Sequence, residues 1–346
     1  MLKMLMRPLT NYLNKQFGDI HLKLGHDHQE IRDALIVIKP EPEYPVSLNW
    51  NYDMLTRDDR TAMLLGGWHA ERVRALPANT PLHEAEFSVF SQAGEDGIIQ
   101  FLLAHIPNTP KTFVEFGVEH YVEANTRFLL KQAYWLGLVL DGSEAAIRYI
   151  YADEISWRHD LTAVQAFITK ENINTLITDA GFSGDIGILS VDIDGNDYWV
   201  WDAITAIQPT IVICEYNATF GDQHAITIPY QADFTRQQGH FSNLYFGASL
   251  PALCHLANNK GYDFVGCNHM GSNAFFIRRD SGHGLPSHTA KTGFMSARFA
   301  ESRNEKGALT FLRGEKRLVQ IANCLVYDII TAKTQTIREQ FGLSKD

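Results

Sequence analysis

The sequence contains few cysteines, no excess of positive charge and no long apolar run. Only four of its 346 residues are cysteines, and no two of them form a C-x-x-C pair, so we expect small core thiols in a reducing compartment. Lys and Arg number 30 against 40 Asp and Glu, which gives a formal net charge of −10. This balance argues against nucleic acid as the main partner, because binding phosphates requires a basic surface.

No apolar stretch approaches the roughly 20 residues of a transmembrane helix, so we expect no transmembrane span. Residues 1–8 are too short a run, and are interrupted too early by charge and proline, to form a secretory signal. We therefore predict a cytoplasmic protein.

The chain also lacks the G-x-G-x-x-G fingerprint of dinucleotide-binding folds. The candidate loop contains Gly117, but Glu119 and His120 occupy positions that follow it. A pyrophosphate beside Glu115 and Glu119 would be repelled, whereas a cationic or zwitterionic ligand would be accepted.

From residue 87 onward, apolar segments typical of strands alternate with segments of helical spacing. This alternation predicts an α/β fold with a doubly wound, mostly parallel sheet, and a terminal antiparallel hairpin is compatible with such a sheet. The predicted strands are residues 112–117, 134–141, 187–193, 210–215, 263–267 and 273–278. The predicted helices include residues 123–132, 143–151, 164–180, 198–208 and 250–260.

The regions that flank this α/β part divide the chain into four predicted domains. Residues 1–38 have near-heptad apolar spacing and predict an amphipathic, coiled-coil-like helix that makes the protein a homo-oligomer. Packing on the protein's own body and contact with a membrane surface are the alternatives for this helix. Residues 39–86 are a linker and a helical segment, and residues 87–280 are the α/β domain. Residues 281–346 are a C-terminal extension whose basic residues either contact an acidic acceptor or form a solvated helix face.

Carboxylates crowd the end of the apolar segment 187–193. Asp192, Asp194 and Asp197 are close in sequence, and their mutual repulsion is costly unless a cation, hydrogen-bond donors or water offset it. Glu215 and Asn217 end the next predicted strand. Asp192, Glu215 and Asn217 are therefore candidate ligands for Mg²⁺ or Mn²⁺, which prefer oxygen ligands. The alternative is that these acids cap helices and accept hydrogen bonds from backbone amides.

Asp141 ends the second predicted strand of the α/β region and is followed by Gly142 and Ser143. An acid at this position can bind both hydroxyls of a ribose in nucleoside-binding α/β folds. It can equally serve as a helix N-cap.

Six short segments of the predicted α/β domain contain most of these polar residues and glycines. They are 91–97 (SQAGEDG), 114–118 (VEFGV) with Asn125 and Thr126, 140–142 (LDG), 190–198 (SVDIDGNDY), 215–217 (EYN) and 271–276 (GSNAFF). Together these segments resemble one known family, the FkbM-like class I methyltransferases. Proteins of this family depend on S-adenosylmethionine and are often found with glycan-modifying genes. The resemblance covers about residues 87–280 and implies a Rossmann-like class I methyltransferase fold with seven strands. The usual glycine after Gly117 is replaced by Glu119.

The resemblance also implies a cofactor site for S-adenosylmethionine. Glu115 and Gly117 would line the methionine moiety, and Asp141 would hold the ribose. The full set of implied cofactor-binding residues is Gln92, Glu95, Asp96, Glu115, Gly117, Asn125, Asp141 and Gly142.

We predict an S-adenosylmethionine-dependent O-methyltransferase that acts on a sugar hydroxyl of a glycan or of a small-molecule glycan precursor. Methyl transfer requires in-line alignment and a base for the acceptor hydroxyl. His120, His224, His240 and His269 lie in loops near predicted strand ends, and an imidazole is suited to proton transfer near neutral pH. The candidate catalytic residues are Asp192, Asp194, His269 and His120.

Two other functions are compatible with the same residues. In a metal-dependent glycosyltransferase, Asp192 and Asp194 would form the D-x-D motif that binds a nucleotide sugar through a metal. In a non-catalytic module, the methyltransferase fold would remain without the chemistry, in keeping with Glu119 in the cofactor loop.

Overall fold

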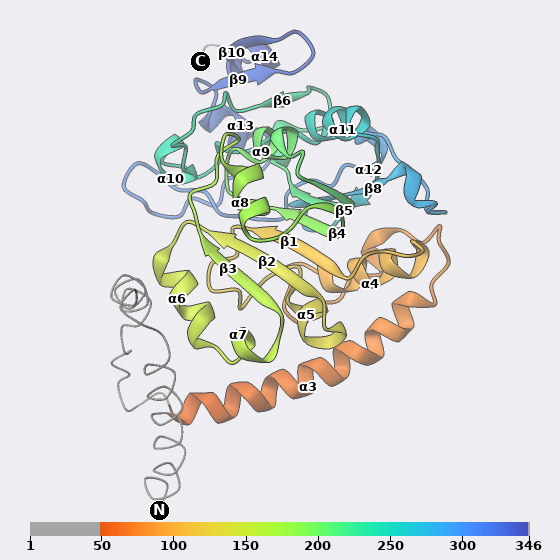
Figure 1. The fold of residues 1–346 in the computed structure, drawn as a ribbon. Helices are drawn as coiled ribbons and strands as arrows, with labels where there is room; N and C mark the ends of the chain where they lie inside the picture. Colours follow the sequence, from red (N-terminus) through yellow and green to blue (C-terminus); the bar gives the residue numbers. More distant parts are fainter. Residues whose placement is uncertain (1–48, 345–346) are drawn as a thin grey trace, which may run out of the picture. The chain divides into compact units, whose positions relative to one another are not determined.

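The fold is built on a seven-stranded sheet whose strands run mostly parallel (Figure 1). A computed structural model describes residues 49–344, with side-chain surroundings from Asp59 onward. The helix predicted over residues 1–38, the oligomer contact assigned to it and the proline-rich part of the linker lie outside the described residues.

The strand order of this sheet is β3-β2-β1-β4-β5-β8-β7. β8 is antiparallel to both of its neighbours, while β1 to β5 pair in parallel. This order, with one reversed strand inserted near the edge, is that of the Rossmann-like class I methyltransferase fold, so the predicted fold class is confirmed. The strands are β1 (Thr112–Phe116), β2 (Leu136–Asp141), β3 (Leu161–Gln165), β4 (Gly184–Val191), β5 (Ile207–Glu215), β7 (Tyr262–Cys267) and β8 (Asn273–Arg278).

Helices cover both faces of the sheet because neighbouring strand residues point to opposite sides. Phe113 of β1 packs in one core with α4 to α7, whereas the next residue, Val114, packs in a second core with α8, α9 and α11. The helices of the first side are α4 (Glu95–His105), α5 (Arg127–Ala133), α6 (Glu144–Ala152) and α7 (Ile155–Arg158), and those of the second are α8 (Ile173–Asp179), α9 (Asp197–Ala203) and α11 (Leu250–Asn259).

Two predicted helices extend into residues that form strands. The helix predicted over residues 198–208 ends at Ala203, and Ile207 and Gln208 belong to β5. The helix predicted over residues 164–180 is wrong in its first part. Residues 161–165 form strand β3 at the edge of the sheet, and the helix α8 starts only at Ile173. Along β3, Leu161 and Ala163 are buried while Thr162 and Val164 are partly exposed. An edge strand with such short, mixed side chains lacks the strong apolar signal of a central strand.

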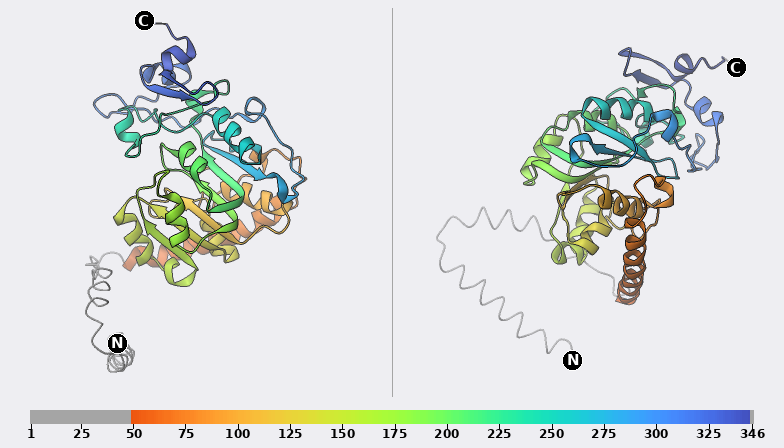
Figure 2. Two further views of the ribbon diagram at one scale, coloured as in Figure 1. Left: turned by 45° about the horizontal axis from the view of Figure 1, so that its top comes forward. Right: turned by 90° about the vertical axis from the view of Figure 1, so that its right-hand side faces the viewer.

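A second, three-stranded sheet has the order β10-β9-β6. We call it, together with α13 and α14, the C-terminal lobe; Figures 1 and 2 show its last elements in blue, away from α5. Its core combines Phe220 and Ile226 with Leu318 and Val326, so residues of the predicted C-terminal extension share a core with residues of the predicted α/β domain. The elements are β6 (Ile226–Thr227), β9 (Leu325–Asp328), β10 (Lys333–Thr336), α13 (Glu315–Gln320) and α14 (Ile337–Phe341).

The remaining helices are short, apart from α3. They are α3 (Asn49–Arg74), α10 (Arg236–Gly239) and α12 (Ala290–Gly293), with 3-10 turns η2 (Leu82–Glu84), η3 (Ala218–Phe220) and η4 (Arg279–Ser281). The residues from Asp59 onward form one compact unit. Among the described residues, no helix is both long and apolar enough to span a membrane.

Candidate functional site

A cavity of about 1170 Å³ lies at the carboxyl ends of β1, β2, β4 and β5. Ligands of open α/β sheets bind at this edge. The volume exceeds the roughly 300–1,000 Å³ of a typical small-molecule site, so the cavity has room for more than one ligand. The predicted site residues that line it are Gln92, Glu115, Gly117, His120, Asn125, Asp141, Gly142, Asp192, Asp194, Glu215 and Asn217.

Gly117 lets the loop after β1 pass close to the end of β4. Its φ is +66°, and a Cβ at this position would lie 1.8 Å from the backbone oxygen of Asp192. Any larger residue would therefore push the two strand ends apart. Glu119, two residues later, also has a positive φ of 47°, the left-handed conformation in which glycine is favoured.

Glu115 anchors the end of this loop. Its carboxylate is buried and accepts hydrogen bonds from the backbone amides of Asn125 (2.8 Å) and Thr126 (3.1 Å), and from the Thr126 hydroxyl. Burial raises the pKa of Glu115 to about 7, although these hydrogen bonds oppose the shift. The side chain therefore shapes the cavity wall as well as lining it.

Asp141 joins the loops after β1 and β2. One of its carboxylate oxygens accepts a hydrogen bond from the backbone amide of Glu119, and the other accepts one from that of Ser143, both at 2.7 Å. Ser143, rather than Asp141, caps α6 by accepting a hydrogen bond from Ala146. Each carboxylate oxygen has a second lone pair, so Asp141 can accept further hydrogen bonds from a ligand in the cavity.

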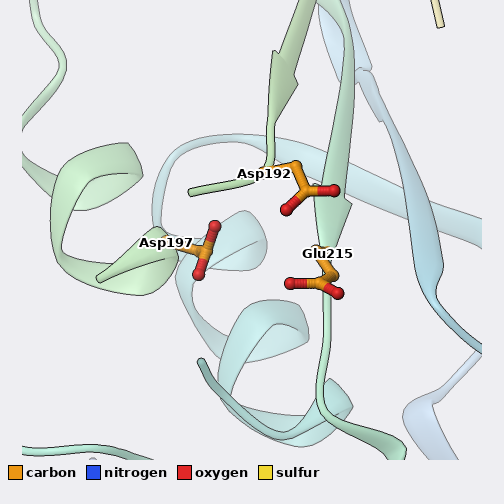
Figure 3. Close-up of side chains that lie close together, drawn as sticks. All are labelled: Asp192, Asp197 and Glu215. Carbon is orange, nitrogen blue, oxygen red and sulfur yellow. The ribbon is translucent and has the colours of Figure 1, made fainter. Parts of the chain in front are cut away.

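Three carboxylates converge beside this loop (Figure 3). Val191 pairs with Cys214 in adjacent parallel strands, which places the next residues, Asp192 and Glu215, side by side. Asp197, at the start of α9, completes the cluster, and one oxygen from each of the three carboxylates lies within 4.8 Å of those from the other two. We call Asp192, Asp197 and Glu215 the acid cluster.

The members of the acid cluster differ in their hydrogen bonds to the rest of the protein. Asp197 accepts hydrogen bonds from the backbone amides of Ile193 (2.8 Å) and Gly195 (3.0 Å), whereas one buried oxygen of Glu215 has no hydrogen-bond partner. Burial and then mutual repulsion raise the pKa values of Asp192 and Glu215 well above their usual range, and burial raises that of Asp197 to about 6. The cluster holds more negative charge than its protein surroundings offset.

Asn217 and Asp194 are not part of this cluster. The side-chain nitrogen of Asn217 donates to the carbonyls of Leu244 (2.9 Å) and Phe246 (3.0 Å), and its oxygen accepts from the Thr219 amide. Asp194 has a positive φ of 53° and pairs with Arg236 at 2.5 Å. Asp197 is the third carboxylate of the acid cluster, and the role of Asn217 as a metal ligand stays a prediction.

Three other predicted site residues are absent from the cavity lining formed by the described residues. Glu95 accepts hydrogen bonds from the side chains of Asn268 (2.7 Å) and Asn273 (2.8 Å). Asp96 accepts hydrogen bonds from the backbone amides of residues 89–91, and burial raises its pKa to about 6. The ring of His269 pairs with Glu86. Glu95 and His269 thus connect the chain around the start of α4 to the β7–β8 hairpin, next to the cavity-lining residues Gln92 and Asn273.

Several cavity-lining residues were not among the predicted site residues. Phe167, in the loop after β3, is 51% exposed and lies against Gly142. Arg236 donates to Asn243 and lies over the ring of Phe246, with 4.0 Å between its guanidinium carbon and the ring centre. Arg317 of α13 reaches the cavity from the C-terminal lobe. Phe167 could have been identified had β3 been predicted, but no local pattern marks either arginine.

Comparison with known proteins gives only distant similarity. No protein-family model matches the chain, and no curated protein matches it. Similar solved structures include the N-terminal domain of EvdMO1 with SAH bound, at 10% identity and TM-score 0.34, over 55% of this chain and 81% of that one. The O-methyltransferase from Bacillus cereus in complex with SAH has 13% identity and TM-score 0.32, over 48% and 72%. The SAH-bound Podospora anserina methyltransferase PaMTH1 has 11% identity and TM-score 0.35, over 70% and 100%. At these values the fold assignment rests on the strand order and directions themselves.

Proposed function

We propose that this protein is an S-adenosylmethionine-dependent O-methyltransferase of FkbM-like type that methylates a sugar hydroxyl of a glycan or glycan precursor. The observation that carries the proposal is that one cavity, at the carboxyl edge of a sheet with methyltransferase strand order, is lined by Asp141 and Phe167 and by two members of the acid cluster, Asp192 and Glu215. A cofactor and an acceptor can therefore lie next to each other in it.

The part of the cavity between β1 and β2 suits the cofactor. Asp141 has spare lone pairs for two ribose hydroxyls, and the exposed face of Phe167 can stack on the adenine. Gln92 and Asn125 offer amide groups for the amino acid end of the cofactor. The positive sulfonium is attracted by the carboxylates around it, so the acidic character that disfavours a pyrophosphate favours this ligand.

The acid cluster suits a divalent cation such as Mg²⁺ or Mn²⁺. Asp192, Asp197 and Glu215 supply hard oxygen ligands within 4.8 Å of one another, and the buried, unpartnered oxygen of Glu215 is the group that a cation would satisfy. When bound, such an ion lowers the pKa of a nearby hydroxyl. The chain's own residues would hold the acceptor in line with the methyl group and take up the hydroxyl proton.

Of the four candidate catalytic residues, three line the cavity: Asp192, Asp194 and His120. Asp194 is engaged by Arg236, which makes it a positioning group for the loop after β4. Asp192 and His120 are therefore the candidates for the base that accepts the proton of the acceptor hydroxyl. His120 packs edge-on against Tyr149, with their ring centres 5.0 Å apart.

The glycosyltransferase alternative is weakened by the pairing of Asp194 with Arg236. A D-x-D motif needs both carboxylates for one metal–nucleotide site, whereas here only Asp192 belongs to the acid cluster. The alternative of a non-catalytic module is weakened because Glu119 adopts the left-handed backbone that a glycine would adopt there.

Calorimetry separates these functions. The full chain is titrated with S-adenosylhomocysteine and, in a separate experiment, with a nucleotide sugar plus Mn²⁺. We expect heat of binding from the first ligand. Heat of binding only from the nucleotide sugar would favour the glycosyltransferase. No heat of binding from either ligand would contradict methyl transfer. Methylation of sugars before and after EDTA then tests the metal, because unchanged activity would remove it from the reaction.

A further inference from the structure

Arg317 is a buried arginine in the wall of the cavity. It is 9% exposed, belongs to α13 of the C-terminal lobe and lines the cavity. Its Nη1 donates to the backbone carbonyls of Phe299 (2.9 Å), Glu301 (3.3 Å) and Leu312 (3.5 Å). These neutral oxygens fix the guanidinium in place without neutralising its charge.

The other edge of the guanidinium is unsatisfied. The Nε of Arg317 is buried and has no hydrogen-bond partner, and a buried donor without an acceptor costs free energy. One oxygen of the nearby Glu301 carboxylate, Oε1, accepts from Arg303, at 2.8 Å, and from the side chain of Asn243, at 3.4 Å, and Glu301 forms no ion pair with Arg317. Burial, followed by repulsion from Arg236, lowers the pKa of Arg317, and the charge of Glu301 opposes this shift only in part, so an anion bound in the cavity would stabilise the guanidinium.

The two arginines of the described cavity lining differ in their surroundings. Arg236 lies beside the acid cluster at the ends of β4 and β5, because it pairs with Asp194. Arg317, with Phe299 and Glu301, lines the part of the cavity next to α13 and forms no ion pair with a described residue, so its charge is available to a ligand. A guanidinium edge with two parallel N–H groups matches the oxygens of a carboxylate or a phosphate.

We infer that the acceptor is an anionic sugar, and that its carboxylate or phosphate group binds Arg317 while its reacting hydroxyl faces the acid cluster. The position of that hydroxyl rests on the proposed methyl transfer, but the binding of the anion does not. A neutral sugar would leave the Nε of Arg317 unsatisfied, so Arg317 selects anionic acceptors against neutral ones of the same size.

Nuclear magnetic resonance of the arginine side chains tests this selection directly. The full chain, saturated with S-adenosylhomocysteine, is titrated with D-glucuronate, D-glucose 1-phosphate or D-glucose, and the Nε–H signal of Arg317 is followed. We expect one of the two anionic sugars to shift this signal saturably, with an affinity about tenfold or more above that of glucose. Glucuronate and glucose 1-phosphate distinguish a carboxylate from a phosphate ester. The inference is overturned if neither anion shifts the signal, or if glucose shifts it equally.

Two variants with the same change in charge provide the control. Arg317→Gln should weaken binding of the preferred anionic sugar about tenfold or more, whereas Lys316→Gln, at the exposed neighbouring position, should change it less than about twofold. Equal effects of the two would show that only overall charge matters and would contradict the inference. If Arg317→Gln does not fold, the titration of the unmodified protein decides alone. Loss of S-adenosylhomocysteine binding by the unmodified protein would contradict the proposed function, whereas failure of the anion titration with that binding intact would contradict only this inference.

Discussion

Two pairs of carboxylates line the same cavity, and they differ in whether the protein supplies hydrogen-bond donors to them. Glu115 and Asp141, at the ends of β1 and β2, each accept hydrogen bonds from two backbone amides. Asp192 and Glu215, at the ends of β4 and β5, lie against each other, and Glu215 has a buried oxygen without a partner. The first pair holds the loops around the cavity in place through hydrogen bonds. The second pair is destabilised by mutual repulsion, which a bound cation would reduce.

This difference shows that an acid at a strand end does not have one role. A carboxylate that satisfies backbone donors contributes to the folded state before any ligand binds. A carboxylate that lacks donors lowers the stability of the ligand-free state and gains most when a cation arrives. The same substitution in the two pairs should therefore have effects of opposite sign.

The largest effect is expected for Glu115→Met, which keeps the size of the side chain but removes its acceptors. The amides of Asn125 and Thr126 and the Thr126 hydroxyl would lose their buried partner. We expect the free energy of unfolding to fall by about 2–4 kcal/mol, measured by urea denaturation. A variant as stable as the unmodified protein would show that Glu115 does not organise the loop.

Divalent cations should act on the other pair. Because the folded pKa of Asp197 is raised to about 6 and those of Asp192 and Glu215 are raised further above their usual range, the folded state binds more protons than the unfolded state above about pH 4. The metal-free protein should therefore lose stability as the pH rises from 5 to 7.5.

At pH 7.5, Mg²⁺ or Mn²⁺ at 100 times its dissociation constant should restore about 2.7 kcal/mol. This gain in stability is measured by thermal unfolding of the protein with each cation and with EDTA in place of the cation. An unfolding midpoint that does not respond to either cation would mean that the acid cluster holds no metal.

A smaller and opposite effect is expected for Glu215→Met. Removing one of the crowded carboxylates relieves repulsion on Asp192 and Asp197, so the metal-free protein should become more stable by about 1 kcal/mol. The same variant should no longer respond to Mn²⁺. Urea denaturation of Glu215→Met and Glu115→Met under the same conditions makes the comparison. Destabilisation of both variants by the same amount would contradict the difference between the two pairs of carboxylates.

The smallest effect is expected at Glu119, where the family resemblance leads one to expect glycine. Glu119→Gly should relieve the cost of a positive φ but increase the entropy of the unfolded chain, for a net change within about 1 kcal/mol. The affinity for S-adenosylhomocysteine should stay within about twofold. A larger loss of affinity would mean that the Glu119 side chain contacts the cofactor.

The sequence was sufficient for the parts of the fold that depend on local apolar patterns. The central strands β1, β4 and β5 and the terminal hairpin β7–β8 were predicted close to their observed bounds, because strands buried on both faces form continuous apolar runs. The edge strand β3 and the three strands of the C-terminal lobe were missed. They are short, and β3 is only partly buried, so pairing with neighbours rather than composition determines their structure.

The positions of the acidic residues at the strand ends could be predicted from the sequence, but the residues that contact them could not. The strand pattern placed Asp192 beside Glu215, but whether Asp197 or Asn217 joined them depended on the turn that starts α9 and on carbonyls of residues 244 and 246. Arg236 and Arg317 come from segments far along the chain, so no local motif connects them to the acids. Glu95 and Asp96 belong to the resembling motif, yet their hydrogen bonds are to the protein itself.

The proposed methyl transfer requires that the loops joined by Asp141 hold S-adenosylmethionine. Calorimetric titration of S-adenosylhomocysteine into three proteins tests it: the unmodified chain, Asp141→Asn, and Asp179→Asn, which removes the same charge from an exposed position on α8. We predict binding to the unmodified chain, a loss of affinity of about tenfold or more in Asp141→Asn and a change in affinity below about twofold in Asp179→Asn. No binding to the unmodified chain, or equal affinities of the two variants, would contradict it.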